Sequence, residues 1–191
     1  MKRLKEKFVP GKTRVRYSGG WFDEVEIKAM VEVARSGWLG AGVVTEKFET
    51  KLAKYIGAAK TLSTNSGSSA TLLCMAALTS RLRPDPLQLG DEVITPACTF
   101  ATTVAAIVHQ GLVPRFVDVA IDTLNPKIED LEKAITKKTK VILIPHTLGN
   151  PNNMTVIMKL ARQHSLYVVE DNCDGLGSFY NGKKTGSFGH L

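Results

Sequence analysis

Short apolar runs, each bounded by polar residues or by glycine and proline, recur along the middle and the end of the chain. Runs of this length and composition are typical of buried β-strands. They predict strands at Glu92–Thr95, Pro114–Val119, Val141–Ile144 and Leu166–Val169, and Lys60–Thr64 is a further short strand candidate. Val141–Ile144 is apolar throughout, as expected for a strand in a parallel sheet that is covered on both faces.

Between these runs, apolar residues follow the three- and four-residue spacing of amphipathic helices. We expect helices from about Phe22 to Gly37, from Thr45 as N-cap to Gly57, from Thr71 to Leu78, from Phe100 to Gln110, from Asn125 as N-cap with Pro126 in the first turn, and from about Thr155 to His164. The pair Asn181-Gly182 predicts the turn of a hairpin. Helices that alternate with strands predict an α/β fold with a mostly parallel sheet, and no linker separates two complete domains.

The chain has 191 residues, of which 43% are hydrophobic and 23% charged, as in a globular protein with one core. No apolar run approaches the ~20 residues that span a bilayer. No signal-type segment follows the basic N-terminus, so we expect a cytoplasmic protein without membrane contact.

The net charge of +7 comes partly from basic clusters in residues 1–16, 137–140 and 183–184. None of these clusters contains the interleaved aromatic residues that stack nucleic-acid bases. A solvated surface is therefore favoured over a nucleic-acid site, and attraction for anionic small molecules such as nucleotides is the weaker alternative.

The chain has three cysteines and four histidines. Cys74, Cys98 and Cys173 lie far apart and form no C-x-x-C pair, so neither a disulfide framework nor a zinc site is predicted. The histidines show no metal-ligand spacing either.

Candidate chemistry is concentrated where the run Leu166–Val169 ends, in Glu170-Asp171-Asn172-Cys173-Asp174. In an α/β sheet, residues at the carboxyl end of a strand face the ligand crevice. An acid fixed there could hold a cationic ring nitrogen. An ordinary strand that ends in a polar turn explains these residues equally well.

Two further segments have the composition of a ligand site. Asn65-Ser66-Gly67-Ser68-Ser69-Ala70 precedes a predicted helix, so its main-chain N–H groups could bind an anion such as a phosphate. A well-capped helix is at least as common an explanation. Phe100 is either a core residue or an aromatic lid over a flat ligand, and taken alone the core is favoured.

Taken together, the motifs resemble one family. The ordered set is Asn65–Ala70, Gly90–Thr95, Phe100–Thr103, Phe116–Val119 and Glu170-Asp171. It is similar to the DegT/DnrJ/EryC1/StrS group of pyridoxal-phosphate enzymes that act on nucleotide-linked keto sugars, and the resemblance runs from about Val15 to the end of the chain.

Within that group the chain most resembles the 3-dehydrase branch, of the CDP-4-keto-6-deoxyglucose-3-dehydrase type in lipopolysaccharide biosynthesis. The resemblance is carried by Ser36–Leu39, His146–Pro151, Glu170–Asp174 and Thr185–Gly189. Aminotransferases of the group usually have a different sequence after the position of His146, and glutamine where Asp174 stands.

The resemblance implies the three-layer large domain of aspartate aminotransferase-like enzymes, with pyridoxal or pyridoxamine phosphate as cofactor. Gly67 and Ser68 would bind the cofactor phosphate. Phe100 would stack on the ring, Asp171 would hold the protonated ring nitrogen, and Asp174 would lie near the ring hydroxyl.

The resemblance also implies residues that this chain does not contain. The group that decides the chemistry would follow Leu191: a lysine that forms the Schiff base in aminotransferases, or a histidine in dehydrases. The smaller C-terminal domain and the iron–sulfur cysteines of the dehydrase branch would follow as well. We therefore interpret residues 1–191 as an N-terminal arm plus most of the large domain, and expect this piece to be inactive alone.

Three functions are compatible with these residues. The first is a 3-dehydrase of nucleotide-linked 4-keto-6-deoxy sugars in lipopolysaccharide or O-antigen synthesis, forming a homodimer and served by a reductase partner. The second is a nucleotide-sugar aminotransferase. The third is a non-catalytic α/β binding module with a basic face.

Overall fold

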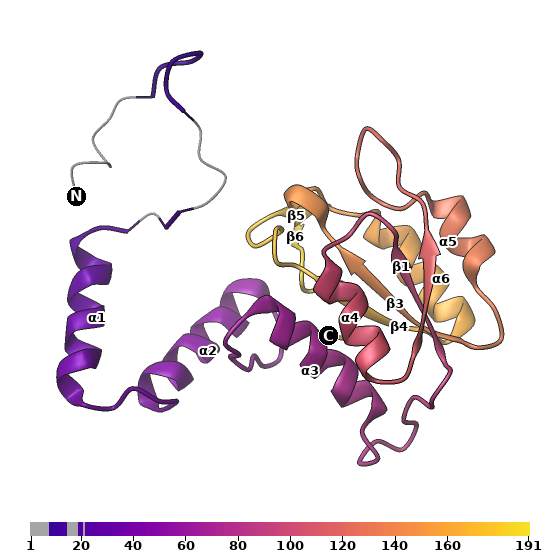
Figure 1. Cartoon of the computed structure of the whole chain (residues 1–191), viewed down its shortest axis with the longest axis horizontal. Coiled ribbons are helices and arrows are strands. Elements are labelled where there is room, and N and C mark those ends of the chain that lie inside the picture. Colours follow the sequence, from indigo (N-terminus) through magenta and orange to yellow (C-terminus); the bar gives the residue numbers. More distant parts are fainter. Residues whose placement is uncertain (1–7, 15–18, 21) are drawn as a thin grey trace. The chain divides into compact units, whose positions relative to one another are not determined.

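The computed structural model describes residues 8–14, 19–20 and 22–191, and it divides the chain into two compact units (Figure 1). The units are Met1–Glu46 and Lys47–Leu191. The basic cluster in residues 1–16 lies largely outside the described residues. In the part of the chain that is described, no helix has the length and apolar character needed to cross a membrane.

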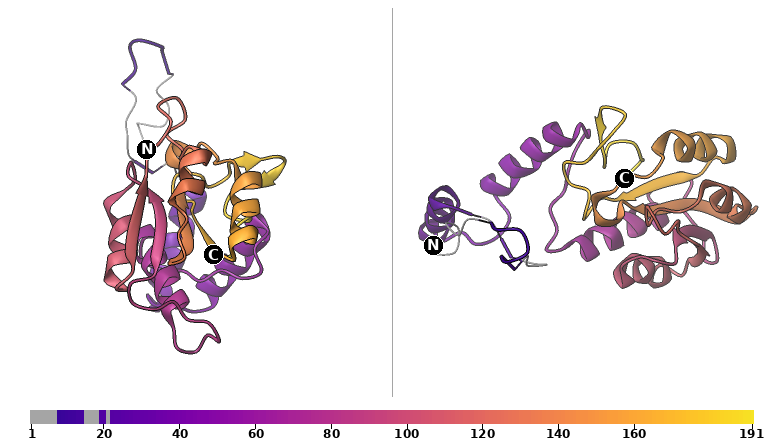
Figure 2. Two further views of the ribbon diagram at one scale, coloured as in Figure 1. Left: turned by 90° about the vertical axis from the view of Figure 1, so that its right-hand side faces the viewer. Right: turned by 90° about the horizontal axis from the view of Figure 1, so that it is seen from above.

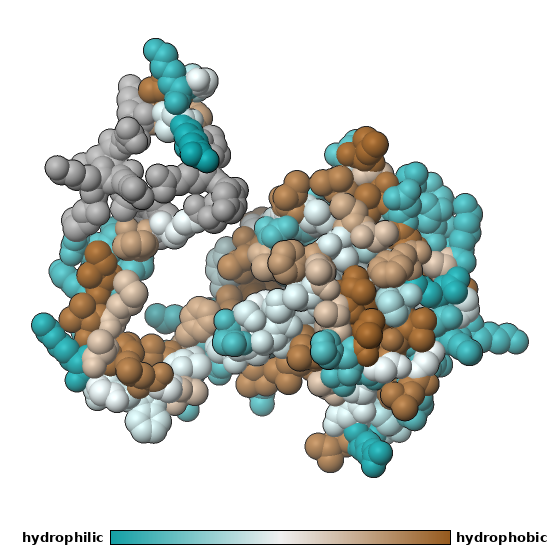
Figure 3. Space-filling model, in the orientation of Figure 1, coloured by the Kyte–Doolittle hydropathy of each residue, from teal (hydrophilic) through white to brown (hydrophobic). Residues whose placement is uncertain are grey.

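The first unit contains α1 (Glu24–Ser36), which confirms the first predicted helix. A capping box begins it: the Asp23 side chain accepts from the N–H of Val25 at 2.8 Å, and the Asp23 N–H donates to Glu26 Oε2 at 2.7 Å. Gly37 ends the helix with a φ of 71°, which only glycine adopts at little cost. The helix has no buried residue, and apolar side chains lie open along it (Figure 3).

The second unit is built on a parallel sheet in the order β2-β1-β3-β4. Its strands are β1 (Glu92–Pro96), β2 (Val113–Val117), β3 (Thr139–Pro145) and β4 (Tyr167–Asp171). Four of the five predicted strands and the α/β fold class are confirmed. The outer edge of β4 is lined by the chain end, where the N–H of His190 donates to the Val168 carbonyl at 2.8 Å.

Helices cover both faces of this sheet (Figures 1 and 2). They are α3 (Gly67–Thr79) and α4 (Ala101–His109) on one face, and α5 (Ile128–Ala134) and α6 (Met154–His164) on the other. Alternate residues of one strand serve opposite layers: Val141 packs toward α3 and α4, and Ile142 packs toward α5 and α6. Each such side chain contributes roughly 1.5–3 kcal/mol on burial, so the strands hold the two helix layers in fixed positions.

A two-stranded hairpin, β5 (Phe179–Tyr180) and β6 (Lys183–Lys184), follows β4. Asn181 and Gly182 form its turn with φ values of 47° and 75°. This is the turn that an Asn-Gly pair favours, so the prediction is confirmed.

The strand predicted at Lys60–Thr64 is wrong. The segment is extended but pairs with no strand; α2 (Val43–Ile56) binds it instead. Thr61 Oγ1 donates to the Glu49 carbonyl and the N–H of Ser63 donates to Glu49 Oε1, both at 2.6 Å. The same helix begins at Val43, so the predicted N-cap Thr45 lies inside its first turn.

The N-cap predicted at Asn125 is also wrong, because α5 begins at Ile128 with Lys127 as its N-cap. The buried Asn125 amide donates instead to the carbonyls of Asn150 and Pro151, at 3.2 and 3.0 Å. The Asn125 side chain thus binds two carbonyls of another loop instead of capping α5.

Candidate functional site

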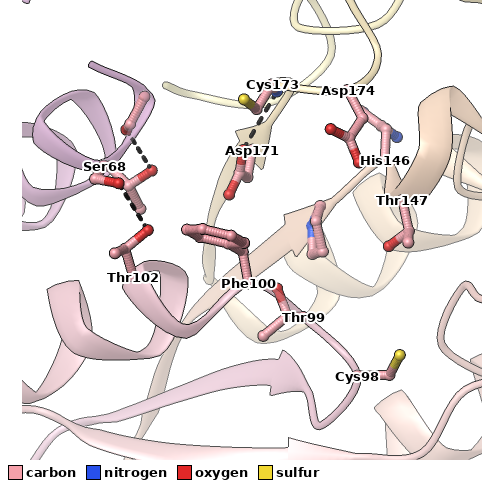
Figure 4. Close-up of a pocket in the computed structure, with 13 residues that line it drawn as sticks. Ser68, Cys98, Thr99, Phe100, Thr102, His146, Thr147, Asp171, Cys173 and Asp174 are labelled. Carbon is pink, nitrogen blue, oxygen red and sulfur yellow. Dashed lines mark hydrogen bonds between the residues drawn. The ribbon is translucent and has the colours of Figure 1, made fainter. Parts of the chain in front are cut away.

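The carboxyl ends of the strands surround a cavity of about 440 Å³ in the second unit (Figure 4). In the sheet, β1 lies between β2 and β3. The chain leads from β1 to β2 on one side and from β3 to β4 on the other side, so the loops after β1 and β3 diverge. Ligands of open α/β sheets bind at such a switch point. The lining residues are Gly67, Ser68, Thr71, Cys98, Thr99, Phe100, Thr102, Pro145, His146, Thr147, Asp171, Cys173 and Asp174. The structure thus brings all five predicted site residues to one cavity.

Asp171 is the last residue of β4, and its carboxylate is fixed by two hydrogen bonds. The buried Thr103 hydroxyl on α4 donates to Oδ2 at 2.9 Å, and the N–H of Cys173 donates to Oδ1 at 3.3 Å. The carboxylate points toward the ring of Phe100 (Figure 4). An oriented negative charge therefore faces the cavity.

Phe100 stands directly before α4 and is 74% exposed. The core position favoured from the residue alone is therefore wrong. An aromatic ring that is left in water beside a fixed carboxylate offers a stacking surface for a flat ligand.

The N-terminus of α3 forms another wall of the cavity. Ser66 caps the helix by accepting from the N–H of Ser69 at 3.2 Å, so the first turn presents Gly67 and Ser68 to the cavity. The Ser68 hydroxyl donates to Thr102 Oγ1 at 2.9 Å. Free N–H groups and the helix dipole make this wall suitable for an anion.

Asp174 belongs to the loop after β4 and ties it to the loop after β3. Its Oδ2 accepts from the N–H of Leu148 at 3.0 Å. Leu148 itself has a φ of 55°, a strained value for a leucine. A Cβ on Gly149 would lie 3.0 Å from the Asp174 carbonyl oxygen, so the two loops approach as closely as a glycine allows.

The cavity-lining His146 forms a buried pair with Glu170, and neither residue received a role in the prediction from sequence. Their Nε2 and Oε2 atoms are 2.9 Å apart, and both side chains are at most 1% exposed. His146 Nδ1 accepts from the N–H of Asn152 at 3.2 Å, so the ring proton is on Nε2 and is donated to Glu170. The available signal was that Glu170 directly precedes the predicted site residue Asp171, and that His146 directly follows Pro145, where β3 ends.

The carboxylate of Glu170 is ionised although it is buried. Burial alone would raise its pKa, but hydrogen bonds from His146 and from the N–H groups of Gly189, Gly186 and Phe188 together hold the pKa below its ordinary value.

The Cys173 thiol at the cavity is not an activated group, and the two lysines of the β5–β6 hairpin are engaged in hydrogen bonds. Burial, with the neighbouring Asp171 and Asp174, raises the pKa of the Cys173 thiol. Lys183 and Lys184 donate to the carbonyls of Ser187 and Tyr55, both at 2.6 Å. Among the described residues, no group of three or more His, Cys, Asp or Glu side chains could hold a metal ion.

Comparison with known proteins finds one family. Residues 22–191 match the model of the DegT/DnrJ/EryC1/StrS aminotransferase family. The chain is 45% identical to the dTDP-4-dehydro-2,6-dideoxy-D-glucose 3-dehydratase of Saccharopolyspora spinosa, over 96% of this chain and 40% of that protein. It is 44% identical to the lipopolysaccharide biosynthesis protein RfbH of Salmonella typhimurium, over 96% of this chain and 42% of that protein.

Among solved structures, the chain is similar to the GDP-4-keto-6-deoxy-D-mannose-3-dehydratase of E. coli, whose structure has hydrated pyridoxal phosphate bound. The TM-score is 0.85 at 39% identity, and the match covers 90% of this chain and 44% of that one. The chain therefore spans less than half the length of the proteins it matches.

Proposed function

The chain belongs to the DegT/DnrJ/EryC1/StrS aminotransferase family, and from this premise we propose that it is part of a 3-dehydrase that acts on nucleotide-linked 4-keto-6-deoxy sugars with pyridoxal or pyridoxamine phosphate. The observation that carries the proposal is the single cavity in which an oriented carboxylate, an exposed aromatic ring and a helix N-terminus meet. The relatives that support the substrate class are 3-dehydratases of keto-deoxy sugars.

The residues fit a phosphorylated pyridine. Gly67 and Ser68 would hold the phosphate through main-chain N–H groups, because the first helical turn leaves these donors unpaired. Phe100 would cover the ring, and Asp171 would pair with its protonated nitrogen. Asp174 would lie on the side of the ring hydroxyl. A cavity of about 440 Å³ is in the range of small-molecule sites.

The cofactor, when bound, would supply an electron sink for breaking bonds next to the sugar carbonyl. The chain's own residues would keep that group charged and in place. Asp171 would hold a proton on the ring nitrogen, and the hydrogen bond from Thr103 orients the carboxylate for this role. Phe100 would exclude water from one ring face.

An aminotransferase is the alternative within the family, as the family's description allows. Asp174 favours the dehydrase, because aminotransferases of the group usually carry glutamine there. A binding module without catalysis is the remaining alternative, and it would need neither the charge of Asp171 nor the exposed ring.

We extend the proposal to the assembly. Residues 1–191 would be an N-terminal arm and most of the large domain of a cytoplasmic homodimer, and the apolar side chains left open on α1 support a subunit contact. A reductase partner would regenerate the dehydrase. The iron–sulfur cluster that the resemblance implies stays a prediction.

The test is to titrate the full gene product with pyridoxal phosphate and pyridoxamine phosphate, and then to supply a nucleotide-linked 4-keto-6-deoxy sugar. With pyridoxamine phosphate as the two-electron reductant, a dehydrase should replace the C3 hydroxyl by hydrogen and release that hydroxyl as water, so that mass spectrometry detects a sugar that has lost one oxygen. An amino sugar formed with glutamate would establish the aminotransferase. If neither cofactor binds and the protein shifts labelled nucleic acid, the binding module is correct.

A further inference from the structure

Glu170 is the most heavily bonded side chain around the cavity, although it does not line it. Four donors converge on its carboxylate: His146 Nε2 at 2.9 Å, and the N–H groups of Gly186, Phe188 and Gly189 at 2.8, 2.7 and 2.6 Å. Its side chain is 1% exposed, and its partners among the described residues are the His146 ring and three main-chain N–H groups. A buried carboxylate with this many oriented donors specifies the positions of all of them.

The first group of partners belongs to the cavity wall after β3. His146 is held between Glu170 on Nε2 and the Asn152 N–H on Nδ1. Pro145 and Thr147, which flank it in sequence, both line the cavity. Glu170 therefore fixes this wall through one imidazole ring.

The second group of partners supports the neighbouring wall, after β4. The segment that contains Gly186, Phe188 and Gly189 begins at the buried Thr185, whose hydroxyl donates to the Gly175 carbonyl at 2.8 Å. The Asn172 side chain donates to the Thr185 carbonyl at 3.1 Å. The loop with Cys173 and Asp174 thus rests on a segment that Glu170 anchors.

The two walls also touch behind the cavity. A Cβ on Gly175 would lie 3.0 Å from His146 Cβ and 2.4 Å from Asn172 Oδ1. Gly175 therefore lies against both His146 and Asn172, and no larger residue fits at its position. A shift of the segment that Glu170 anchors would move Gly175 against His146.

We infer that Glu170 is a positioning residue of the candidate site, which joins its two walls through one buried carboxylate. It reaches no ligand itself. It sets the separation of Thr147 from Cys173 and Asp174, and with it the shape of the space beside Asp171. This inference rests on the proposed function only where pyridoxal phosphate is the probe.

The experiment compares Glu170→Gln with Glu92→Gln in the full gene product. Glutamine keeps the size of the side chain but turns one acceptor oxygen into an NH2 group, which faces two of the four N–H donors. Glu92 is the matched control: it is a half-buried strand glutamate with its own hydroxyl donor, Thr136 Oγ1 at 2.5 Å, and it begins β1 at the other end of the sheet.

We expect Glu170→Gln to weaken pyridoxal phosphate binding about tenfold or more, because bonds to a charged acceptor are lost on both walls. Binding by Glu92→Gln should stay within about twofold of wild type, whatever its effect on unfolding. In ¹⁵N spectra the wild type should show His146 with its proton on Nε2, and this signal should move in Glu170→Gln alone. Equal affinities in wild type and Glu170→Gln, with an unmoved His146 signal, would overturn the inference.

Two outcomes need a second readout. If Glu170→Gln does not fold, Thr185→Val breaks the same linkage more gently. This variant should raise the dissociation constant for pyridoxal phosphate. An affinity equal to that of the wild type would refute the positioning role of Glu170. If the wild type does not bind pyridoxal phosphate, the proposed function fails. Amide exchange then decides the inference: faster exchange at both Leu148 and Asp174 in Glu170→Gln supports it, and exchange unchanged from wild type refutes it.

Discussion

Asp171 carries the charge on which the proposed chemistry depends. Asp171→Asn keeps the size of the side chain and an acceptor for Thr103, but removes the negative charge from the cavity. We expect turnover to fall roughly 10²–10³-fold, the usual effect of removing one oriented electrostatic group. Steady-state assays with the 4-keto sugar measure it.

The control for this change is Asp118→Asn. Asp118 follows β2 at the same edge of the sheet but does not line the cavity. Its replacement should leave turnover near wild type. Near-normal turnover of Asp171→Asn would show that the charge is dispensable and that the ring-nitrogen role is wrong.

Glu170 should make the free energy of unfolding depend on pH in the acid range. Its pKa in the folded protein lies below the ordinary value of about 4.3. The ionised carboxylate therefore contributes its full stabilisation above the ordinary pKa, and this is lost as the pH falls from there through the folded pKa.

Urea unfolding at a series of pH values tests this. The free energy of unfolding of the wild type should fall below about pH 4–5, and Glu170→Gln should be less stable at neutral pH but lose less on acidification. Parallel pH profiles of the two proteins would show that Glu170 does not titrate with folding.

At the scale of elements, the N-terminus of α3 is predicted to bind the cofactor phosphate through its main-chain N–H groups. Ser68→Pro removes one N–H within the first helical turn, where proline is tolerated. Ser68→Ala removes only the hydroxyl, which bonds Thr102. We expect proline to weaken pyridoxal phosphate binding clearly and alanine to cost about 1 kcal/mol.

Fluorescence titration with the cofactor measures both affinities, and far-UV circular dichroism shows whether α3 persists in each variant. If the two variants bind equally well while both remain helical, the phosphate is not held by these main-chain N–H groups.

The elements that sequence patterns predicted well are those with a full apolar face. The helices α3, α4, α5 and α6 bury β3 and β4 on both faces. The runs of aliphatic residues in these strands therefore predict a buried parallel strand directly. Lys60–Thr64 has a single apolar residue, Leu62, and is bound by the Glu49 backbone and carboxylate. Such a bond to a neighbouring helix has no local signature.

The site divides in the same way. The positions of Asp171, Gly67 and Ser68 at the cavity could be predicted, because a strand end and a helix start are recognisable in the local sequence. The role of Glu170 could not, since its partners lie from 16 to 24 residues away in sequence. Phe100 was misjudged because its exposure depends on how α4 meets the cavity, which its own neighbours do not reveal.

At the scale of the whole molecule, residues 1–191 should bind the cofactor but should not convert the substrate. The described part of the chain holds the anion site, the ring acid and the exposed aromatic around one cavity. It offers no free base beside them: Lys183 and Lys184 are bonded to carbonyls, and His190 Nδ1 accepts from the N–H of Val168 at 3.0 Å. The chain spans 40–44% of the length of its relatives.

We therefore expect residues 1–191, expressed alone, to bind pyridoxal phosphate weakly and to convert no nucleotide-linked 4-keto sugar. Proton transfer at the reacting carbon needs a group within hydrogen-bond reach, and the nearest histidine, His146, is buried with both ring nitrogens engaged. Parallel assays of residues 1–191 and of the full gene product measure the difference. Turnover by residues 1–191 would place the catalytic group within them, and Lys183→Ala, Lys184→Ala, His146→Asn and His190→Asn would then identify it.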